Sequence, residues 1–146
     1  MLLRRAFLVL ATLWTIAIPL AAYAASRNGA PQAVYGFALA VYSVGRIVCH
    51  QLPARSFHAW MVSLPVCARC TGIYFGAAAT AVVRASRPSG GPAGADSRLV
   101  FLIACLPTAA TLVFEWTTGI TPANWIRALA GLPLGAAVAW AIGMVN

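Results

Sequence analysis

The sequence contains very few acidic residues and no lysine. Asp96 and Glu115 carry its only carboxylic side chains, and all ten basic residues are arginines. Charged residues make up 8% of the 146 positions, whereas soluble domains carry about 25%. So little charge excludes an ordinary soluble domain, and the length suits one small membrane domain rather than two.

Recognisable catalytic motifs are also absent. The chain has no nucleophile–base–acid triad, no phosphate-binding loop and no His-Glu-x-x-His sequence. Its net charge of +8 would suggest nucleic acid in a soluble protein. Here, however, the arginines stand singly or in pairs at the ends of apolar runs, as is typical of helix ends anchored at membrane surfaces. We therefore expect contact with membrane lipid and no nucleic-acid partner, and we assign no catalytic residue.

Apolar residues are what the chain has in abundance, at 62% of the sequence with a mean hydropathy of +0.84. They fall into five runs separated by short polar or Gly/Pro-rich segments. The runs are Ala6–Ala25, Gln32–Val48, Val66–Val83, Leu99–Trp116 and about Ala123–Val145. This pattern predicts an all-α fold, an integral membrane helical bundle with about five transmembrane spans.

The first apolar run has two interpretations. It follows Arg4 and Arg5, and Ala22-Tyr23-Ala24 resembles a signal-peptide cleavage site. The run is longer than the usual ~7–15 apolar residues of a signal peptide, which favours a retained helix. We therefore divide the chain into two parts. Residues 1–31 form an N-terminal transmembrane anchor (or signal peptide) and its loop. Residues 32–146 form a four-span core that contains a flexible loop at residues 84–98.

Three of the four cysteines and both histidines fall within Val48–Gly72. Cys67 and Cys70 form a Cys-x-x-Cys sequence at the start of the third run, and Cys49 and His50 lie upstream. Three thiols and one imidazole form a Cys₃His set, which is one of the usual tetrahedral zinc sites. We predict that Cys49, His50, Cys67 and Cys70 bind a metal ion, zinc. His58 is a rival fourth ligand, because adjacent Cys49 and His50 side chains bind one ion awkwardly.

Two other functions stay open. A thiol at a helix N-terminus beside Arg69 has a lowered pKa. Cys67 and Cys70 therefore also fit a quinone-linked thiol–disulfide oxidoreductase, with quinone as the cofactor. Labile thiolates would instead suit a soft-metal transporter or chaperone. Cys105 stands alone within an apolar run, and we expect it only to pack.

Counting membrane crossings brings residues from the second half of the chain to the cysteines. The third run leaves the cysteine segment for the opposite membrane face, and the fourth run returns. Polar residues at that face are expected to form a rim around the site, either as salt bridges or as an anion-binding group. These residues are Arg55, Arg69, Glu115, Asn124 and Arg127.

The stretch CHQLPARSF…LPVCARCTGIYFG, from Cys49 to Gly76, resembles the prokaryotic membrane-protein family called domain of unknown function 2085. Glu115, the following threonines, Asn124, Arg127 and the spaced glycines are similar to the second motif of that family. The likeness covers roughly residues 46–143. The resemblance implies a multi-span, bacterial membrane protein in which one group of residues acts together: Cys49, His50, Arg55, Cys67, Cys70 and Arg127.

The arginines at the N-terminus predict the orientation. With Arg4 and Arg5 inside and two crossings before the cysteine segment, the site lies on the cytoplasmic face of the cell inner (cytoplasmic) membrane. An outward-facing site would lie in an oxidising compartment and would favour disulfide chemistry. The sequence indicates neither a protein partner nor an oligomeric state.

Overall fold

The computed structural model describes residues 2–85 and 97–144, and this part of the chain is helical apart from one small hairpin and the connecting loops. The predicted all-α class is confirmed. Residues 86–96, at the centre of the predicted flexible loop, lie outside the described part. The elements in chain order are α1 (Leu2–Ser26), α2 (Gln32–Val48), the 3-10 helix η1 (Pro53–Arg55), β1 (His58–Ala59), β2 (Val62–Ser63), α3 (Ala68–Ala85), α4 (Ser97–Thr118) and α5 (Asn124–Met144).

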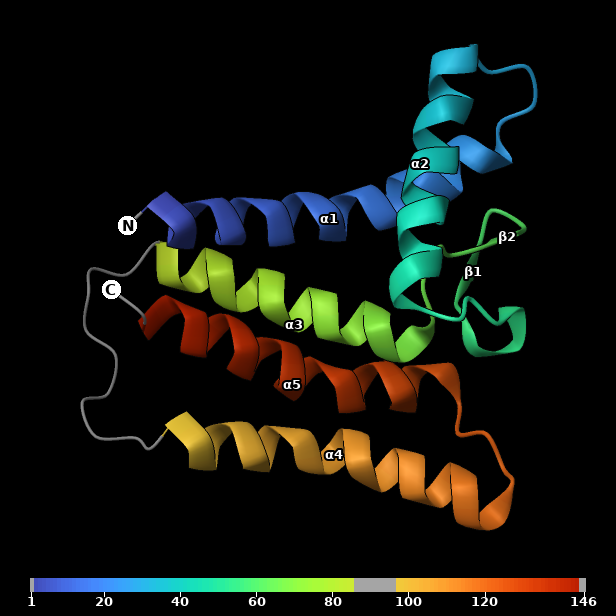
Figure 1. Ribbon diagram of the computed structural model, residues 1–146. Helices are drawn as coiled ribbons and strands as arrows, with labels where there is room; N and C mark the ends of the chain where they lie inside the picture. Colours follow the sequence, from blue (N-terminus) through green and yellow to red (C-terminus); the bar gives the residue numbers. More distant parts are fainter. Residues whose placement is uncertain (1, 86–96, 145–146) are drawn as a thin grey trace.

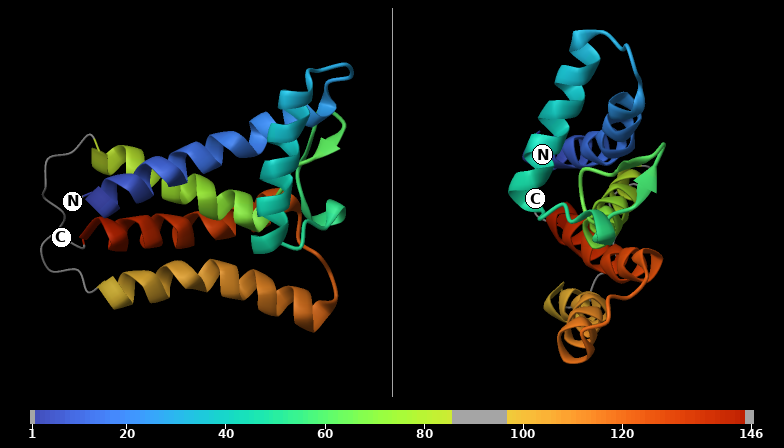
Figure 2. Two further views of the ribbon diagram at one scale, coloured as in Figure 1. Left: turned by 45° about the horizontal axis from the view of Figure 1, so that its top comes forward. Right: turned by 90° about the vertical axis from the view of Figure 1, so that its right-hand side faces the viewer.

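Four helices lie side by side in the order α1, α3, α5, α4 (Figure 1). The helix α2 instead runs across the end of this row at which α3 begins, and both views in Figure 2 show the same crossing. The 3-10 helix and the hairpin lie at that end as well. The segment that carries the cysteines and histidines therefore folds over one end of the row.

Three of the described helices contain a stretch that is long and apolar enough to cross a membrane: Arg5–Ser26, Arg98–Thr118 and Asn124–Ile142. The predicted count of about five spans is not confirmed. The helix α2 has 17 residues and lies across the other helices. An apolar run of this length is compatible with a helix that lies along a membrane surface as well as with one that crosses, so its sequence alone could not separate the two.

The helix α3 is at the centre of the packing, with α1 on one side and α5 on the other. An added Cβ at Gly72 would collide with the carbonyl oxygen of Ala128, and one at Gly135 would collide with that of Ile73. The backbones of α3 and α5 therefore approach closely, as small residues four apart allow. Because α3 is flanked by protein on two sides, its small side chains pack against helices rather than lipid.

The helix α1 packs against α3 and against the cysteine segment. Thr15 donates a hydrogen bond to the carbonyl oxygen of Tyr74 at 3.0 Å. Ile18 and Ala22 are fully buried and belong to one cluster with Cys49 and other residues of the cysteine segment. This packing is what a retained anchor needs, and retention of α1 stays a prediction.

Candidate functional site

Three cysteine thiols meet where α2 ends and α3 begins. The Sγ atoms of Cys49, Cys67 and Cys70 all lie within 4.8 Å of one another. Cys49 is buried at the C-terminus of α2, and the other two are half-buried at the start of α3. All three are free thiols, and the backbone N–H of Cys67 donates to Cys49 Sγ at 3.2 Å. Cys105, also free, lies in α4 outside this group.

Contacts to the backbone hold the loop between α2 and α3 in place. Gly45 lies one turn before Cys49, and an added Cβ there would collide with the carbonyl oxygen of Pro65. The Gln51 side chain donates to the carbonyl oxygens of Tyr42 at 2.8 Å and Pro65 at 2.6 Å. Gln51 has a φ of 49°, an uncommon value for a residue other than glycine. These contacts press the end of α2 against the residues just before α3, which brings the thiols together.

Neither histidine belongs to the group of three sulfurs. His50 is exposed, and the backbone of Cys49 is extended, so the two neighbouring side chains point in opposite directions. His50 nevertheless lines the same cavity as the thiols. His58 is exposed on β1. The roles of His50 as fourth ligand and of His58 as its rival therefore stay predictions.

The Cys67 thiol has an unusually low pKa. A hydrogen bond from the Cys70 thiol is the largest of the influences that lower the pKa of Cys67 to about 5, and burial opposes the shift. The backbone carbonyl oxygen of Cys67 accepts the first backbone hydrogen bond of α3, from the Thr71 N–H at 2.9 Å. Cys67 therefore lies at the positive end of the helix dipole. The shift favours the thiolate, the form that binds metals and attacks disulfides.

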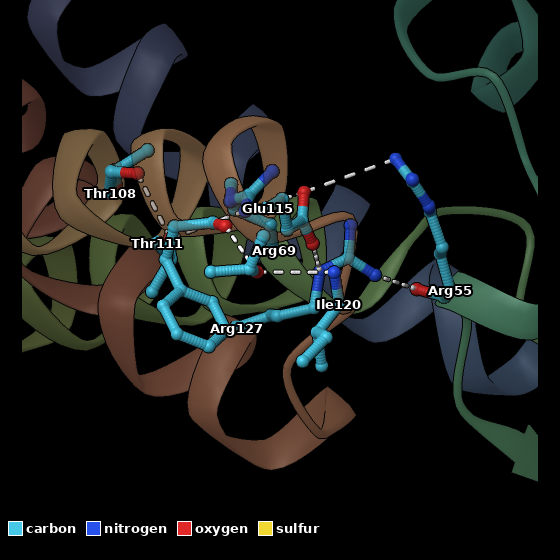
Figure 3. A network of polar contacts seen from close by, with 9 residues as sticks. Arg55, Arg69, Thr108, Thr111, Glu115, Ile120 and Arg127 are labelled. Carbon is cyan, nitrogen blue, oxygen red and sulfur yellow. Dashed lines mark hydrogen bonds and ion pairs between the residues drawn. The ribbon is translucent and has the colours of Figure 1, made fainter.

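Three arginines from three elements converge on Glu115 near the end of α4 (Figure 3). Glu115 Oε1 lies 3.0 Å from Arg127 Nε, and Glu115 Oε2 lies 3.5 Å from Arg69 Nη2 and 3.9 Å from Arg55 Nη1. The Glu115 and Arg127 side chains are 5% and 1% exposed, whereas that of Arg55 is 41% exposed. The pair with Arg127 is therefore a buried ion pair, and the pair with Arg55 is largely screened by solvent.

The start of α5 is tied to the loop around η1. Asn124 Nδ2 donates to the carbonyl oxygen of Ser56 at 3.0 Å, and Arg127 Nη1 donates to that of Arg55 at 3.3 Å. Ser56 is fully buried. The structure thus brings all five predicted rim residues to the same end as the thiols.

Two further residues take part that sequence reasoning missed. Ser56 accepts the hydrogen bond from Asn124, and Thr111 Oγ1 accepts one from Arg69 Nη2 at 3.2 Å. Ser56 belongs to the quoted motif CHQLPARSF, but it accepts through its backbone carbonyl oxygen, which any residue supplies. A threonine in an apolar helix carries no signal of its own. For Thr111 the one usable hint was its position one helical turn before Glu115.

A cavity of about 340 Å³ joins the thiols to the arginines. It is lined by all three thiols of the group and by all three arginines, whereas Glu115 does not line it. Within the described part of the chain, the lining residues are Val48, Cys49, His50, Gln51, Leu52, Arg55, Cys67, Arg69, Cys70 and Arg127.

The family model described as "Predicted membrane protein (DUF2085)" matches residues 49–141. The chain belongs to this family. The matched region begins at Cys49 and ends within α5, so it contains the thiols, the arginine cluster and Glu115 but leaves out α1 and α2. The resemblance noted from the cysteine motif is thereby confirmed.

A shorter stretch is similar to an uncharacterised protein of Methanocaldococcus jannaschii, with 47% identity over 38 residues. The stretch is 26% of this chain and spans 24% of the length of that relative. Because the relative is archaeal, the expected bacterial origin is not supported. No solved structure matches the chain.

Proposed function

We propose that this protein is a multi-pass membrane protein that binds one zinc ion through Cys49, Cys67 and Cys70, and that His50, which lines the same cavity, turns toward the thiols to become the fourth ligand. The observation that carries the proposal is the approach of the three Sγ atoms to within 4.8 Å of one another. Zn–S bonds of about 2.3 Å at tetrahedral angles separate sulfur atoms by about 3.8 Å. The thiols therefore need only a small contraction to enclose an ion.

The ion would fasten the end of α2 to the start of α3. Cys49 comes from one helix and the other two thiols from the next, so metal binding closes the loop between them. Arg127 adds positive charge near Cys67, which favours the ionised, metal-binding form of that thiol. The proposed role is structural.

Zinc content tests the proposal directly. The purified protein is expected to hold about one zinc ion per chain, and Cys49→Ser should reduce the content below about a tenth of that value, because removing one ligand opens the site. His50→Ala should weaken zinc binding, while the controls His58→Ala and Cys105→Ser should leave it unchanged. Elemental analysis measures the zinc content, and thiol titration measures the number of free thiols. Full zinc content in Cys49→Ser would refute the site, and loss in His58→Ala instead of His50→Ala would reassign the fourth ligand.

A thiol–disulfide oxidoreductase is the second candidate, favoured by the lowered pKa of Cys67. The same titration separates it from zinc binding, because a redox site would hold no metal and would form a reversible Cys67–Cys70 disulfide.

A quinone partner fits the structure less well than the thiol chemistry does. The apolar cavity of about 640 Å³ is lined by residues such as Thr80, Pro107 and Trp140, and Thr80 lies about 15 Å along α3 from Cys70. Readily exchanged copper would indicate a soft-metal carrier.

The arrangement of the helices supports four crossings rather than five. The helices α1, α4 and α5 qualify as spans, and α1 ends where α3 begins while α3 ends where α4 begins (Figure 1). The chain must therefore return through α3 if α1 and α4 cross. In this arrangement α2 lies at the membrane surface rather than across the bilayer.

Four crossings reverse the predicted orientation. The start of α1, the end of α3 and the start of α4 share the end of the row away from the thiols, and they carry Arg4, Arg5, Arg84 and Arg98. Outside the cluster, the thiol end carries only Arg27 and Arg46 in the described residues. The positive-inside rule then assigns the thiol end to the outer face of the inner membrane, an oxidising location that counts in favour of the disulfide candidate. The cytoplasmic face expected from the sequence relied on α2 as a crossing.

Cysteine labelling tests this orientation. Met61→Cys at the fully exposed hairpin tip and Ile120→Cys in the exposed α4–α5 turn should both react with a membrane-impermeant maleimide in intact spheroplasts. Ala85→Cys, exposed at the opposite end of α3, should react only after permeabilisation. The unmodified protein gives the background of the native thiols. The reverse pattern would restore the cytoplasmic face, and unequal behaviour of Met61→Cys and Ile120→Cys would refute the four-helix topology.

A further inference from the structure

The arginine cluster has more positive charge than its carboxylate neutralises. Three guanidinium groups share Glu115, so the cluster carries a net charge of +2. A zinc ion with three thiolates would contribute −1 and leave an excess of +1. Arg69 and Arg127 are nearly buried and share one carboxylate, and buried charge without a full partner is strongly unfavourable. An anionic partner that enters the cluster from outside would remove this cost.

The same arginines retain unused hydrogen-bond donors. A guanidinium group has five N–H donors, and the contacts within the cluster involve Nη1 of Arg55, Nη2 of Arg69, and Nε and Nη1 of Arg127. Arg69 Nε is buried and makes no hydrogen bond in the described part of the chain. Arg127 is almost completely buried, yet it borders the cavity.

The three arginines meet at one place. Arg55, Arg69 and Arg127 all line the 340 Å³ cavity, whereas Glu115 does not. The carboxylate therefore contacts the guanidinium groups without lining the cavity itself. Figure 3 shows how the three side chains reach Glu115 from separate elements. The cavity is thus bordered by cationic side chains that one carboxylate keeps in position.

We propose that this cavity binds a phosphate group through Arg55, Arg69 and Arg127. A carboxylate is planar and offers two oxygen atoms, which suits one or two arginines. The tetrahedral oxygens of a phosphate accept from guanidinium groups that approach from three directions, as these do from η1, α3 and α5. The cavity lies at the end of the helical row, where phosphate headgroups border the hydrocarbon of a bilayer. This proposal does not depend on the metal site.

Binding to the full-length protein in dodecyl maltoside tests the proposal. The probes are inorganic phosphate, dihexanoyl phosphatidylglycerol and, as the uncharged comparison, dihexanoyl glycerol, and calorimetry gives the dissociation constants. Arg55→Gln should weaken the binding of the phosphate-bearing probe at least about tenfold, because a charge-assisted contact is lost. Arg55 is partly exposed, so the protein should remain folded without it. Arg46→Gln, an exposed arginine at the end of α2 that does not line the cavity, is the matched control.

The outcomes separate the sources of the phosphate. Binding of phosphatidylglycerol alone supports a lipid headgroup, and binding of inorganic phosphate supports a soluble ligand. Absence of binding by both probes, equal binding of dihexanoyl glycerol, or equal loss in Arg46→Gln and Arg55→Gln would overturn the proposal. Zinc content measured on the same samples keeps the two proposals apart. Phosphate binding can fail while the metal is retained, and the metal can be absent while phosphate still binds.

Discussion

Replacing Glu115 with glutamine should lower the free energy of unfolding by about 3–5 kcal/mol, because it leaves the buried Arg127 and the nearly buried Arg69 without their shared counter-charge. The substitution keeps the shape and removes only the negative charge. Steric trapping in bicelles, or titration with SDS followed by circular dichroism, measures the change. A loss below about 1 kcal/mol would mean that the carboxylate does not hold the arginines.

A double substitution separates charge from shape. Arg127→Met alone should also be strongly destabilising, because Glu115 then faces only the more distant Arg69 and Arg55. Glu115→Leu combined with Arg127→Met removes both charges of the closest pair, and it should be less destabilising than the sum of the single changes. Additive effects would contradict a direct coupling between the two side chains.

The position of Glu115 could be predicted from the sequence, because the argument needed only the path of the chain from α3 to α5. An apolar helix that leaves one face and another that returns bring residues 115–127 back beside the cysteines, whatever happens before α3. The clustering of the thiols was likewise readable, since Cys67 and Cys70 are one helical turn apart and Cys49 lies a short loop away.

The direction of α2 could not be predicted in the same way. Its 17 residues are apolar, and length and hydropathy do not tell a helix along a membrane surface from one through it. Its crossing over the end of the row depends on tertiary contacts, such as the close approach of Gly45 to Pro65. The predicted membrane face of the site depended on counting α2 as a crossing, so that prediction changed as well. The outward direction of His50 depends on the extended backbone of Cys49, which composition does not reveal.

Replacing Gly72 with alanine should lower the free energy of unfolding by about 3 kcal/mol, at the upper end of the usual cost of overpacking. The added Cβ would meet the carbonyl oxygen of Ala128, a backbone atom that moves only if α5 moves. Gly36→Ala in α2 is the matched control, because no atom lies within 4 Å of its added Cβ. That change should be neutral or stabilising by up to about 1 kcal/mol, since alanine favours helix. Equal effects of the two changes would refute close packing of α3 and α5.

The same variant should divide the site into its two halves. The thiols come from α2 and the start of α3, so separating α3 from α5 leaves them together. Arg69 is on α3 and Arg127 is on α5, so their shared contact with Glu115 depends on the packing that Gly72 permits. We therefore expect folded Gly72→Ala protein to keep its zinc and to lose phosphate binding, measured by elemental analysis and calorimetry on one preparation. Loss of zinc with retained phosphate binding would contradict this division, because it would make the thiols, rather than the arginines, dependent on the α3–α5 contact.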